Sequence, residues 1–302
     1  LARRLRLFSQ KRGAVLSLAL AHTDEAVQLN RTTGAARLSV ERRDGRSVAA
    51  ELYSAQPLRV LMPRPGVGEP LTAVLANLSG GIVGGDLYET DINVGPGASL
   101  TLTAQAAEKV YKSSGAQAEN HLTMRVAEGA VLEWLPQGTI LFDRALFRQR
   151  VRFDLAADST LFAGSISILG RSAMGERFAS GRYREHWDLK RDGRLVWADR
   201  FELADPAGAA AASSGLRNVT CFATALFARP DAADDLDWAR DVQAGAAGDI
   251  RCGVTAIDNN LLAMRWLGGD AMRLRSAVGA FWSAARVRWL GLPVRMPVIW
   301  RI

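Results

Sequence analysis

The residues most suggestive of chemistry form a short glycine-rich stretch, "GGIVGGD", at positions 80–86. Loops of this kind bind phosphate when they lie between a strand and a helix N-terminus. Here Asp86 follows the last glycine in place of the Lys of a Walker A loop, and the next segment, "LYETDINVG", alternates as a strand does. The stretch is therefore predicted to be a strand corner. Its glycines permit close backbone approach, and Asp86 braces the corner or meets a ligand.

Other catalytic patterns are absent from the sequence. The three histidines, His22, His121 and His186, lie far apart, and none has a second His or Cys at the spacing of a metal site. Neither Cys221 nor Cys252 has a histidine close in sequence, and no Gly-x-Ser-x-Gly elbow occurs. The residues alone indicate no known class of enzyme, although side chains distant in sequence can still meet in space.

Ionisable side chains recur just beyond predicted strands, in three local clusters. These are "AAEKVYKSSG" at 106–115, "EWLPQGTILFDRA" at 133–145 and "ILGRSAMGERFASGRYRE" at 168–185. Each cluster has two interpretations. It is either a turn with solvated charge, which composition favours, or part of a line of groups on adjacent strand ends, where binding residues tend to lie.

The elements that must position these residues are mainly strands. From about residue 36 to 203, apolar residues recur with period two. The dipeptides Asp44-Gly45 and Asp192-Gly193 stand between alternating runs and predict two β-hairpins. Short strands joined by Gly, Pro and Asp turns predict an all-β sandwich, barrel or coil.

Helices are predicted only towards the C-terminus, after a low-complexity, Ala-rich loop at 204–215. A first helix is predicted to begin at Asp258 and to end at the glycines 268–269. A second is predicted to begin after Asp270 as its N-cap and to end at Gly291. An apolar stripe at helical spacing is predicted to pack in the core, with room for a partner; it consists of Leu274, Val278, Phe281, Ala285 and Trp289.

Length and composition favour a folded protein with a sizeable core. The chain has 302 residues, of which 48% are hydrophobic, and no apolar run approaches the ~20 residues that span a bilayer, so we expect a soluble protein. The net charge of +7 and the pI of about 10.0 suggest an acidic partner surface. Because the arginines are scattered through strand-like segments, a solvated basic surface is favoured over nucleic-acid binding. Two cysteines suit a reducing cytoplasm.

The organisation expected from these patterns is an extension followed by one domain. Residues 1–32 are predicted to be a poorly defined N-terminal extension, whose basic residues and short apolar run only vaguely resemble a signal peptide. Residues 33–302 are predicted to form a single β-rich domain with a helical part at about 258–290.

In this order, the motifs closely resemble those of the urease accessory proteins of the UreD type, also called UreH. The resemblance lies in "GGIVGGD", "TLTAQAAEKVYKS", the second and third clusters above, "DGRLVWADRFEL", and the late pattern "RWLGGDAMRLRSAVGAFWSAARVRWLGLPVRMPVIW". It extends from about Thr33 to the C-terminus. The resemblance implies a mainly β fold of stacked, coiled sheets with two C-terminal helices.

The resemblance also implies a scaffold for urease maturation that is not an enzyme. Proteins of this type bind apo-urease and, on another surface, an all-helical accessory protein of the UreF type. Together with a nickel-carrying GTPase of the UreG type they form the activation complex, and nickel is thought to pass through the UreD-type subunit. We accordingly expect no tightly bound cofactor, transient Ni²⁺ only, no nucleic-acid or membrane partner, and a cytoplasmic location.

Eight positions of the family's motifs are candidate site residues. They are Asp86, Lys109, Tyr111, Gln137, Thr139, Asp143, Arg171 and Glu176. The three carboxylates are predicted to line or flank a polar nickel path, braced by the Lys and the Arg, because weak oxygen ligands suit transfer better than storage. The alternative is that these five charged groups form buried ion pairs that hold strand corners together. No stable metal site is predicted.

One departure from the family and two other function classes bear on this assignment. The family usually has Pro-Gln-Glu-Thr where this chain has Gly138, so one carboxylate is missing. A non-catalytic basic β-protein that binds nucleic acid would need aromatic platforms beside clustered arginines, whereas another acidic partner would need only the charge. A sugar-active, β-helix-like enzyme would need two carboxylates at a fixed separation.

Overall fold

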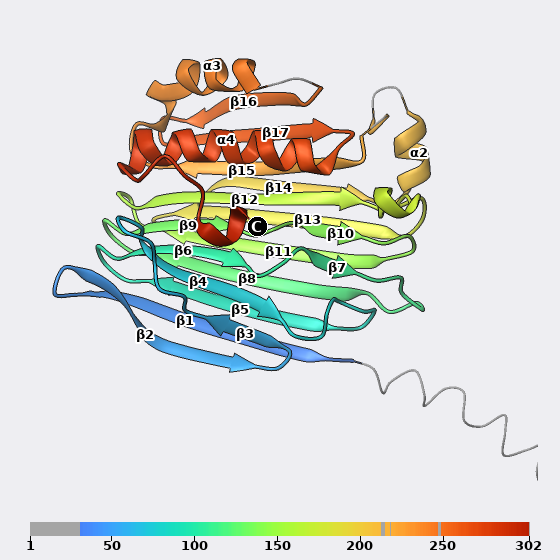
Figure 1. Ribbon diagram of the computed structural model, residues 1–302, viewed down its shortest axis with the longest axis horizontal. Coiled ribbons are helices and arrows are strands. Elements are labelled where there is room, and N and C mark those ends of the chain that lie inside the picture. Colours follow the sequence, from blue (N-terminus) through green and yellow to red (C-terminus); the bar gives the residue numbers. More distant parts are fainter. Residues whose placement is uncertain (1–30, 213–214, 218, 247–248, 302) are drawn as a thin grey trace, which may run out of the picture.

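The computed structural model describes residues 31–212, 215–217, 219–246 and 249–301. The predicted N-terminal extension, residues 1–32, therefore lies almost wholly outside the described residues. Its division from a single following domain stays a prediction. The described chain forms two β-sheets with a shared apolar interior (Figure 1).

The first sheet has seven strands, and the second has ten. The order in the first sheet is β14 (Arg194–Leu203), β13 (Arg182–Arg191), β11 (Leu146–Leu155), β8 (Ala118–Val126), β5 (Leu87–Val94), β1 (Thr33–Arg43) and β2 (Arg46–Ala55). The order in the second is β16 (Arg251–Asp258), β17 (Leu261–Gly268), β15 (Cys221–Ala228), β12 (Thr160–Leu169), β9 (Val131–Leu135), β6 (Ser99–Ala104), β4 (Leu71–Asn77) and β3 (Leu58–Leu61). The short strands β10 (Thr139–Leu141) and β7 (Glu108–Val110) extend the second sheet from β12.

Successive coils of the chain each add one strand to each sheet. In the first sheet β5, β8, β11 and β13 are parallel neighbours, and in the second β6, β9 and β12 are. Antiparallel hairpins stand at the ends of both sheets. The protein is therefore a two-sheet, solenoid-like stack, which confirms the predicted mainly β fold of coiled sheets.

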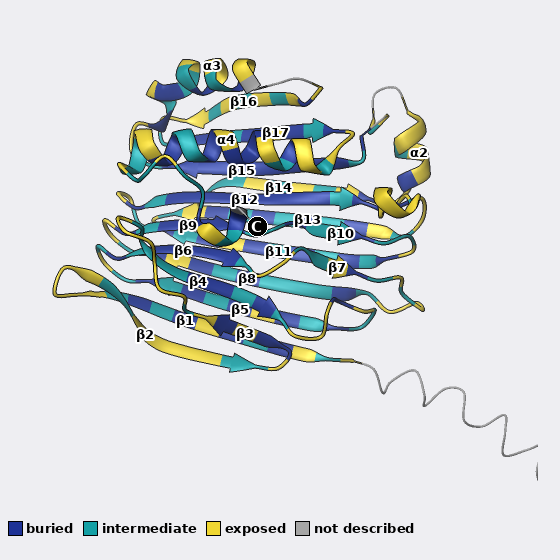
Figure 2. Ribbon diagram, in the orientation of Figure 1, coloured by how far each residue is buried: buried dark blue, intermediate teal, exposed yellow. Residues whose placement is uncertain are grey.

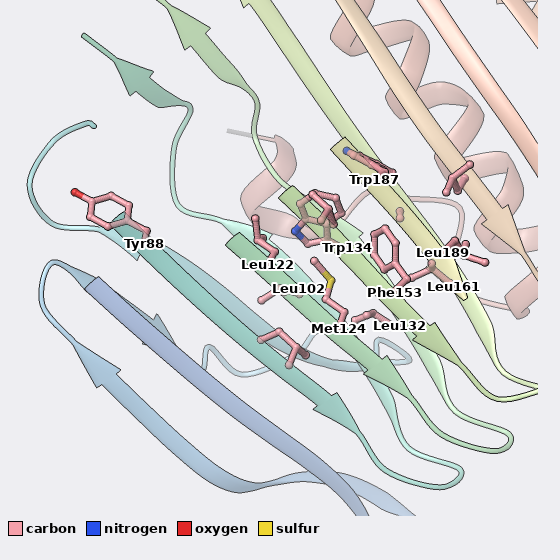
Figure 3. Packing of buried hydrophobic residues seen from close by; sticks show 14 of the residues in the cluster. Tyr88, Leu102, Leu122, Met124, Leu132, Trp134, Phe153, Leu161, Trp187 and Leu189 are labelled. Atoms are coloured by element: carbon pink, nitrogen blue, oxygen red, sulfur yellow. The ribbon is translucent and has the colours of Figure 1, made fainter. Parts of the chain in front are cut away.

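The parallel register stacks equivalent apolar side chains over one another between the sheets. One such column is Leu38, Ile92, Met124, Phe153 and Leu189, all buried. Leucines and aromatic rings of the second sheet pack against it (Figure 3). This stacking explains why the strand segments share one period-two pattern, since each coil must present apolar residues inwards at the same positions.

Both predicted hairpins are confirmed. Asp44-Gly45 joins β1 to β2, and Asp192-Gly193 joins β13 to β14. All four residues have positive φ, between 48° and 77°, as a two-residue hairpin turn requires.

The two sheets differ in how their outer faces are covered. In the second sheet, Thr101 and Thr103 alternate with inward leucines but are only 1% and 2% exposed. Their hydroxyls donate to Glu133 and to the Leu135 carbonyl. The second sheet is thus buried on both faces here, whereas the outer strand β2 of the first sheet is largely exposed (Figure 2).

Helices cover part of the second sheet. The longest, α4 (Ala271–Leu290), lies across β15 and β17 and packs against α3 (Leu236–Ala246) (Figure 1). The remaining short helices are α2 (Pro206–Ala211), η1 (Ser172–Met174), η2 (Ala232–Asp235) and η3 (Val298–Arg301). Of the helices described, none is both long and apolar enough to cross a membrane.

The predicted second C-terminal helix is confirmed at both ends. Asp270 accepts a hydrogen bond from the Arg273 N–H at 2.9 Å, and Gly291 ends the helix with a φ of 62°. Four of the five side chains in the predicted apolar stripe are buried, and the fifth, Trp289, is partly buried.

The predicted first helix, from Asp258, is wrong. Residues 261–268 form strand β17, and the helix that accompanies α4 is α3, which precedes β16 in the sequence. Asp258 accepts from the Asn260 N–H at 2.7 Å within a hairpin turn, so it caps a turn and not a helix. Leu262, Met264 and Trp266 are buried at period two, the pattern of a strand. The Ala-rich loop is also partly wrong, because it contains α2 with Asp205 as N-cap.

A buried charge network fixes α4 to the second sheet. Arg286 of α4 is fully buried, and its Nε donates to Glu133 of β9 at 2.9 Å. Its other nitrogens donate to Glu69 and to the Arg295 carbonyl. Trp282 Nε1 also donates to Glu133, at 3.0 Å. Every charge in the network has an opposite partner, which offsets the cost of removing it from water.

Replacing Arg286 with Met should therefore destabilise the fold strongly. Glu133 would remain buried without its cation, which costs about 3–5 kcal/mol in the free energy of unfolding. Urea denaturation of Arg286→Met would measure the loss. The control is Arg273→Met, because Arg273 makes an exposed ion pair with Asp249 that contributes little. If the two variants unfolded at equal urea concentrations, the role assigned to Arg286 in the buried charge network would be contradicted.

Candidate functional site

The glycine-rich corner links β4 to β5 and packs against β7. A Cβ on Gly81 would lie 2.4 Å from the Tyr111 ring and 2.7 Å from the Lys109 carbonyl oxygen. A Cβ on Gly84 would lie 2.4 Å from the Ser113 hydroxyl. The stretch is followed by strand β5 and not by a helix. The prediction of a strand corner with close backbone packing is confirmed, and the phosphate loop is excluded.

Asp86 holds this corner together from inside. Its carboxylate is buried, and it accepts hydrogen bonds from the N–H groups of Thr32 and Val83, each at 3.0 Å. The Tyr88 hydroxyl donates to it at 3.2 Å. Burial raises the pKa of Tyr88 to about 12, and the neighbouring Asp86 charge acts in the same direction, so Tyr88 stays a hydrogen-bond donor.

A second cluster lies at the neighbouring strand corners, after β10 and β12. Asp143 Oδ1 accepts from the N–H groups of Ala179 and Ser180 at 3.0 and 2.8 Å. Glu176 accepts from the Asp143 N–H at 3.1 Å and from Arg171 Nε at 3.1 Å. These contacts tie the loop after β12 to the loop after β10.

Both carboxylates of this cluster are held in the charged form. Burial raises the pKa of Asp143, but the hydrogen bonds from Ser180 and Ala179 outweigh it and lower the pKa below the ordinary value. The hydrogen bond from Arg171 is the main cause of the lowered pKa of Glu176. They are therefore ionised at neutral pH.

Tyr111 joins this second cluster through an aromatic contact. The Arg171 guanidinium lies 4.3 Å from the centre of the Phe142 ring, and Phe142 packs edge-on against Tyr111 at 4.9 Å. The Tyr111 hydroxyl donates to the Gly80 carbonyl at 3.1 Å, which connects this cluster to the glycine-rich corner. Four predicted residues thus come together here: Tyr111, Asp143, Arg171 and Glu176.

Gln137 is not part of that group. Its amide donates to the Ile299 carbonyl at 2.9 Å and accepts from Arg275 of α4 at 2.5 Å. Gln137 therefore attaches the C-terminal segment to the second sheet. Gly138 beside it has a φ of 124°, a conformation that favours glycine, so a Glu at this position would strain the backbone seen in this chain.

A cavity of about 260 Å³ with a mixed apolar and polar lining lies between the sheets, and two further predicted residues, Lys109 and Thr139, line it. The polar side chains that share its lining come from both sheets and from the corner. They are Asn77, Tyr88, Thr103, Gln105, Glu108, Asn120, Gln149 and Ser165. Asp86 reaches this cavity through its bond to Tyr88, whereas Asp143 and Glu176 lie outside its lining.

Glu108 is the carboxylate of this cavity. Burial raises the pKa of Glu108 to about 7, although the hydrogen bond from Asn77 at 3.0 Å opposes the rise. Near neutral pH the cavity therefore holds an acid that is about half ionised.

Within the described ranges, no three His, Cys, Asp or Glu side chains lie close enough together to hold a metal ion. Each carboxylate predicted to contact nickel, Asp86, Asp143 or Glu176, has protein partners instead. Its transient contact with nickel stays a prediction.

Comparison with known proteins places this chain in a family. The family model described as UreD urease accessory protein matches residues 32–301. The chain belongs to the UreD family. It is 40% identical to the urease accessory protein UreD of Magnetococcus marinus over 89% of this chain and 94% of that protein. The UreD of Rhodopseudomonas palustris strain HaA2 is also 40% identical, over 87% of this chain and 94% of that protein. The UreD of Bradyrhizobium diazoefficiens is 40% identical as well, over 85% of this chain and 92% of that protein.

The lining of the cavity in this UreD-family protein includes Asn120 and Gln149, which the sequence analysis does not single out as site residues, and Glu185 lies behind Gln149, outside that lining. Asn120, Gln149 and Glu185 each occupy an inward position of a strand, between apolar neighbours. Gln149 donates to the buried Glu185 at 3.0 Å and accepts from Asn120 at 3.4 Å. In the sequence, such residues could be identified as polar residues at positions where the alternating pattern of a strand calls for an apolar, inward-facing side chain.

The close packing of the corner yields a prediction for Gly81. Gly81→Ala should lower stability by about 1–3 kcal/mol, because the new methyl group would clash with Tyr111 and the Lys109 backbone. The matched control is Gly80→Ala, since a Cβ there meets nothing within 4 Å although its φ is also positive. Thermal unfolding of both variants is the measurement. A Gly80→Ala loss as large as that of Gly81→Ala would contradict a steric role.

Glu108 yields a prediction on pH. Its pKa rises from 4.5 to about 7 on folding, so the folded protein binds the proton more tightly than the unfolded chain does. The stability this contributes is present below about pH 4.5 and is lost as the pH rises to about 7. Glu108→Gln should remove up to about 3 kcal/mol of this pH dependence. Urea denaturation at several pH values measures it, and Glu128→Gln, at an exposed position, is the control. The prediction would be contradicted if the free energy of unfolding of Glu108→Gln changed with pH as steeply as that of the wild-type protein.

Proposed function

We propose that this UreD-family protein is a scaffold for urease maturation. It binds apo-urease and, on another surface, a helical accessory protein of the UreF type, and it assembles with a nickel-carrying GTPase of the UreG type. It helps to deliver nickel to the urease active site and holds no tightly bound cofactor of its own. Support comes from 40% identity to urease accessory proteins over nearly the whole chain.

The observation that carries the nickel-delivery part of the proposal is the cavity between the sheets, whose lining is apolar in part and polar in part. Its polar lining consists mainly of amide, hydroxyl and carboxylate groups, which bind Ni²⁺ weakly. Burial raises the pKa of Cys221 to about 11 and of Cys252 to about 12, so neither thiol offers a thiolate at neutral pH. A chain without strong ligands on the route suits a metal that must leave again.

The eight predicted residues take different parts in this proposal. Lys109 and Thr139 line the cavity, and Asp86 joins it through Tyr88. Asp143, Arg171 and Glu176 hold the adjoining corner, so their contact with nickel would require the corner to open. Asp86 and Glu108 are the carboxylates best placed to meet the cargo.

A glycosidase is a weaker candidate. Its general acid needs a carboxyl group with a raised pKa opposite a second carboxylate. Glu108 has a raised pKa, but among the described residues no second carboxylate lies with it in the lining of the cavity. In Asp143 and Glu176 the pKa is lowered, and both are hydrogen-bonded to neighbouring loops. We therefore propose a protein without catalytic activity of its own.

Co-expression with the urease structural and accessory proteins tests the proposal. Pull-down of the complexes reports assembly, and the nickel content of the purified urease reports delivery. Asp86→Ala and Glu108→Gln should leave assembly intact and give nickel-poor urease. Glu176→Ala is the comparison, since it loosens a corner outside the cavity lining.

Two results would count against the proposal. If the wild-type protein retains none of these partners, the scaffold function is wrong. If the complexes assemble and the cavity variants give fully nickel-loaded urease, the delivery route through this cavity is wrong while the scaffold function stands.

A further inference from the structure

The outer face of the first sheet presents a group of arginines on β11, β13 and β14, towards the β14 edge. Arg148, Arg150 and Arg152 of β11 point outwards, since they alternate with the buried Gln149, Val151 and Phe153. Arg184 and His186 of β13 and Arg200 of β14 lie on the same face. We call these six residues the cationic patch. The helices α3 and α4 pack on the second sheet, away from it (Figure 1).

The strand register forces like charges together in this patch. Arg148 lies directly beside Arg184, and Arg150 lies between His121 of β8 and His186. His186 in turn lies beside Arg200. Neighbouring strands are only about 4.8 Å apart, and like charges in directly opposed positions destabilise a sheet. Arg148 and Arg184 are such a pair, and they need carboxylates nearby to offset their repulsion.

The arginines of the patch also act on His186. Burial lowers the pKa of this histidine, and the charges of Arg200, Arg148, Arg150 and Arg184 lower it further. Four arginines therefore act on one partly exposed side chain. His186 is neutral at physiological pH, and the positive charge of the patch comes from its arginines.

Carboxylates on the sheet compensate only part of the patch. Arg148 pairs with Glu119 at 3.3 Å, Arg184 with Glu202 at 2.8 Å, and Arg200 with Asp188. Across the described part of the chain, no carboxylate pairs with Arg150 or Arg152. These two arginines also line a surface hollow of about 260 Å³, together with Glu89, Asp91 and His121.

From this arrangement we infer that the cationic patch is a docking surface for an acidic region of a partner protein, with Arg150 and Arg152 as its central contacts. The inference rests on the proposed scaffold function and names one of its binding surfaces. Partner carboxylates would supply the counter-charges that the sheet lacks, and the guanidinium groups can bind them in a bidentate manner.

The hollow also argues against nucleic acid as the occupant. Glu89 and Asp91 of β5 line the same hollow as the two central arginines of β11, on the other side of β8, and Glu89 lies directly beside His121. A continuous phosphate backbone would meet these carboxylates and be repelled. A protein surface of mixed charge can place a carboxylate against Arg150 and a basic side chain against Glu89.

Charge reversal tests the inference. The variant Arg150→Glu/Arg152→Glu is compared with Arg43→Glu/Arg46→Glu, which makes the same change in net charge at the exposed β1–β2 hairpin. Binding to apo-urease, to the UreF-type protein and to the UreG-type GTPase is measured separately by biolayer interferometry, at low and at raised salt. A DNA duplex and a single-stranded RNA serve as further probes.

The patch variant should weaken one of these complexes by roughly tenfold or more, and wild-type binding of that partner should fall steeply with salt. The hairpin variant should bind normally. The milder Arg150→Gln/Arg152→Gln should weaken the same complex severalfold and should unfold at the same or a higher temperature, because it relieves repulsion. This result separates loss of a contact from loss of the fold.

Three outcomes would overturn the inference. In the first, the wild-type protein binds a partner and both patch variants bind it equally well, which leaves the scaffold function intact. In the second, an oligonucleotide binds through the same two arginines. In the third, the wild-type protein binds none of the three partners, and the scaffold function fails as well.

Discussion

The contact between Arg286 and Glu133 joins parts of the chain that lie 153 residues apart, and it fixes the longest described helix of the protein to the second sheet. The arginine belongs to α4 and the glutamate to β9 in the middle of the second sheet, while Glu69 adds the loop before β4. A guanidinium has five N–H donors, and here several of them reach an acceptor without water. Such a group tolerates few other positions, so it specifies how α4 sits on the sheet.

This attachment also makes the two sheets unequal. The second sheet is covered by α4 and by the C-terminal segment that Gln137 and Trp300 tie down. The first sheet keeps its outer face for charged side chains. The two sheets therefore differ in role. The second sheet packs against the helices, and the outer face of the first sheet is free to present a surface. The interior between them remains apolar at its centre and polar near the glycine-rich corner.

Local features of this fold could be predicted from the sequence, whereas partners distant in sequence could not. The Asp-Gly hairpins and the caps of α4 depend on a few neighbouring residues, and they are confirmed. The helix predicted for residues 258–268 is wrong because Asp258 and the glycines at the end of the segment suit a helix, and pairing with β16 and β15, which lie on other parts of the chain, makes the segment a strand. The cavity is assembled from several coils, so no single motif reveals Glu108 as its carboxylate. Its neighbours Lys109 and Thr139 could be named only through the family resemblance.

The coiled architecture has a consequence for how the molecule comes apart. Each coil is stabilised chiefly by contacts with the coils beside it, so the stability of the stack depends on interactions between neighbouring coils. At one end, β2 is largely exposed, and among the described strands only β1 pairs with it in the first sheet. Nearer the other end, α3 and α4 pack against each other and together contact three strands of the second sheet, β15, β16 and β17. Opening motions therefore begin at the N-terminal coils and fade towards the helices, which gives the stack a loose end and a fastened one.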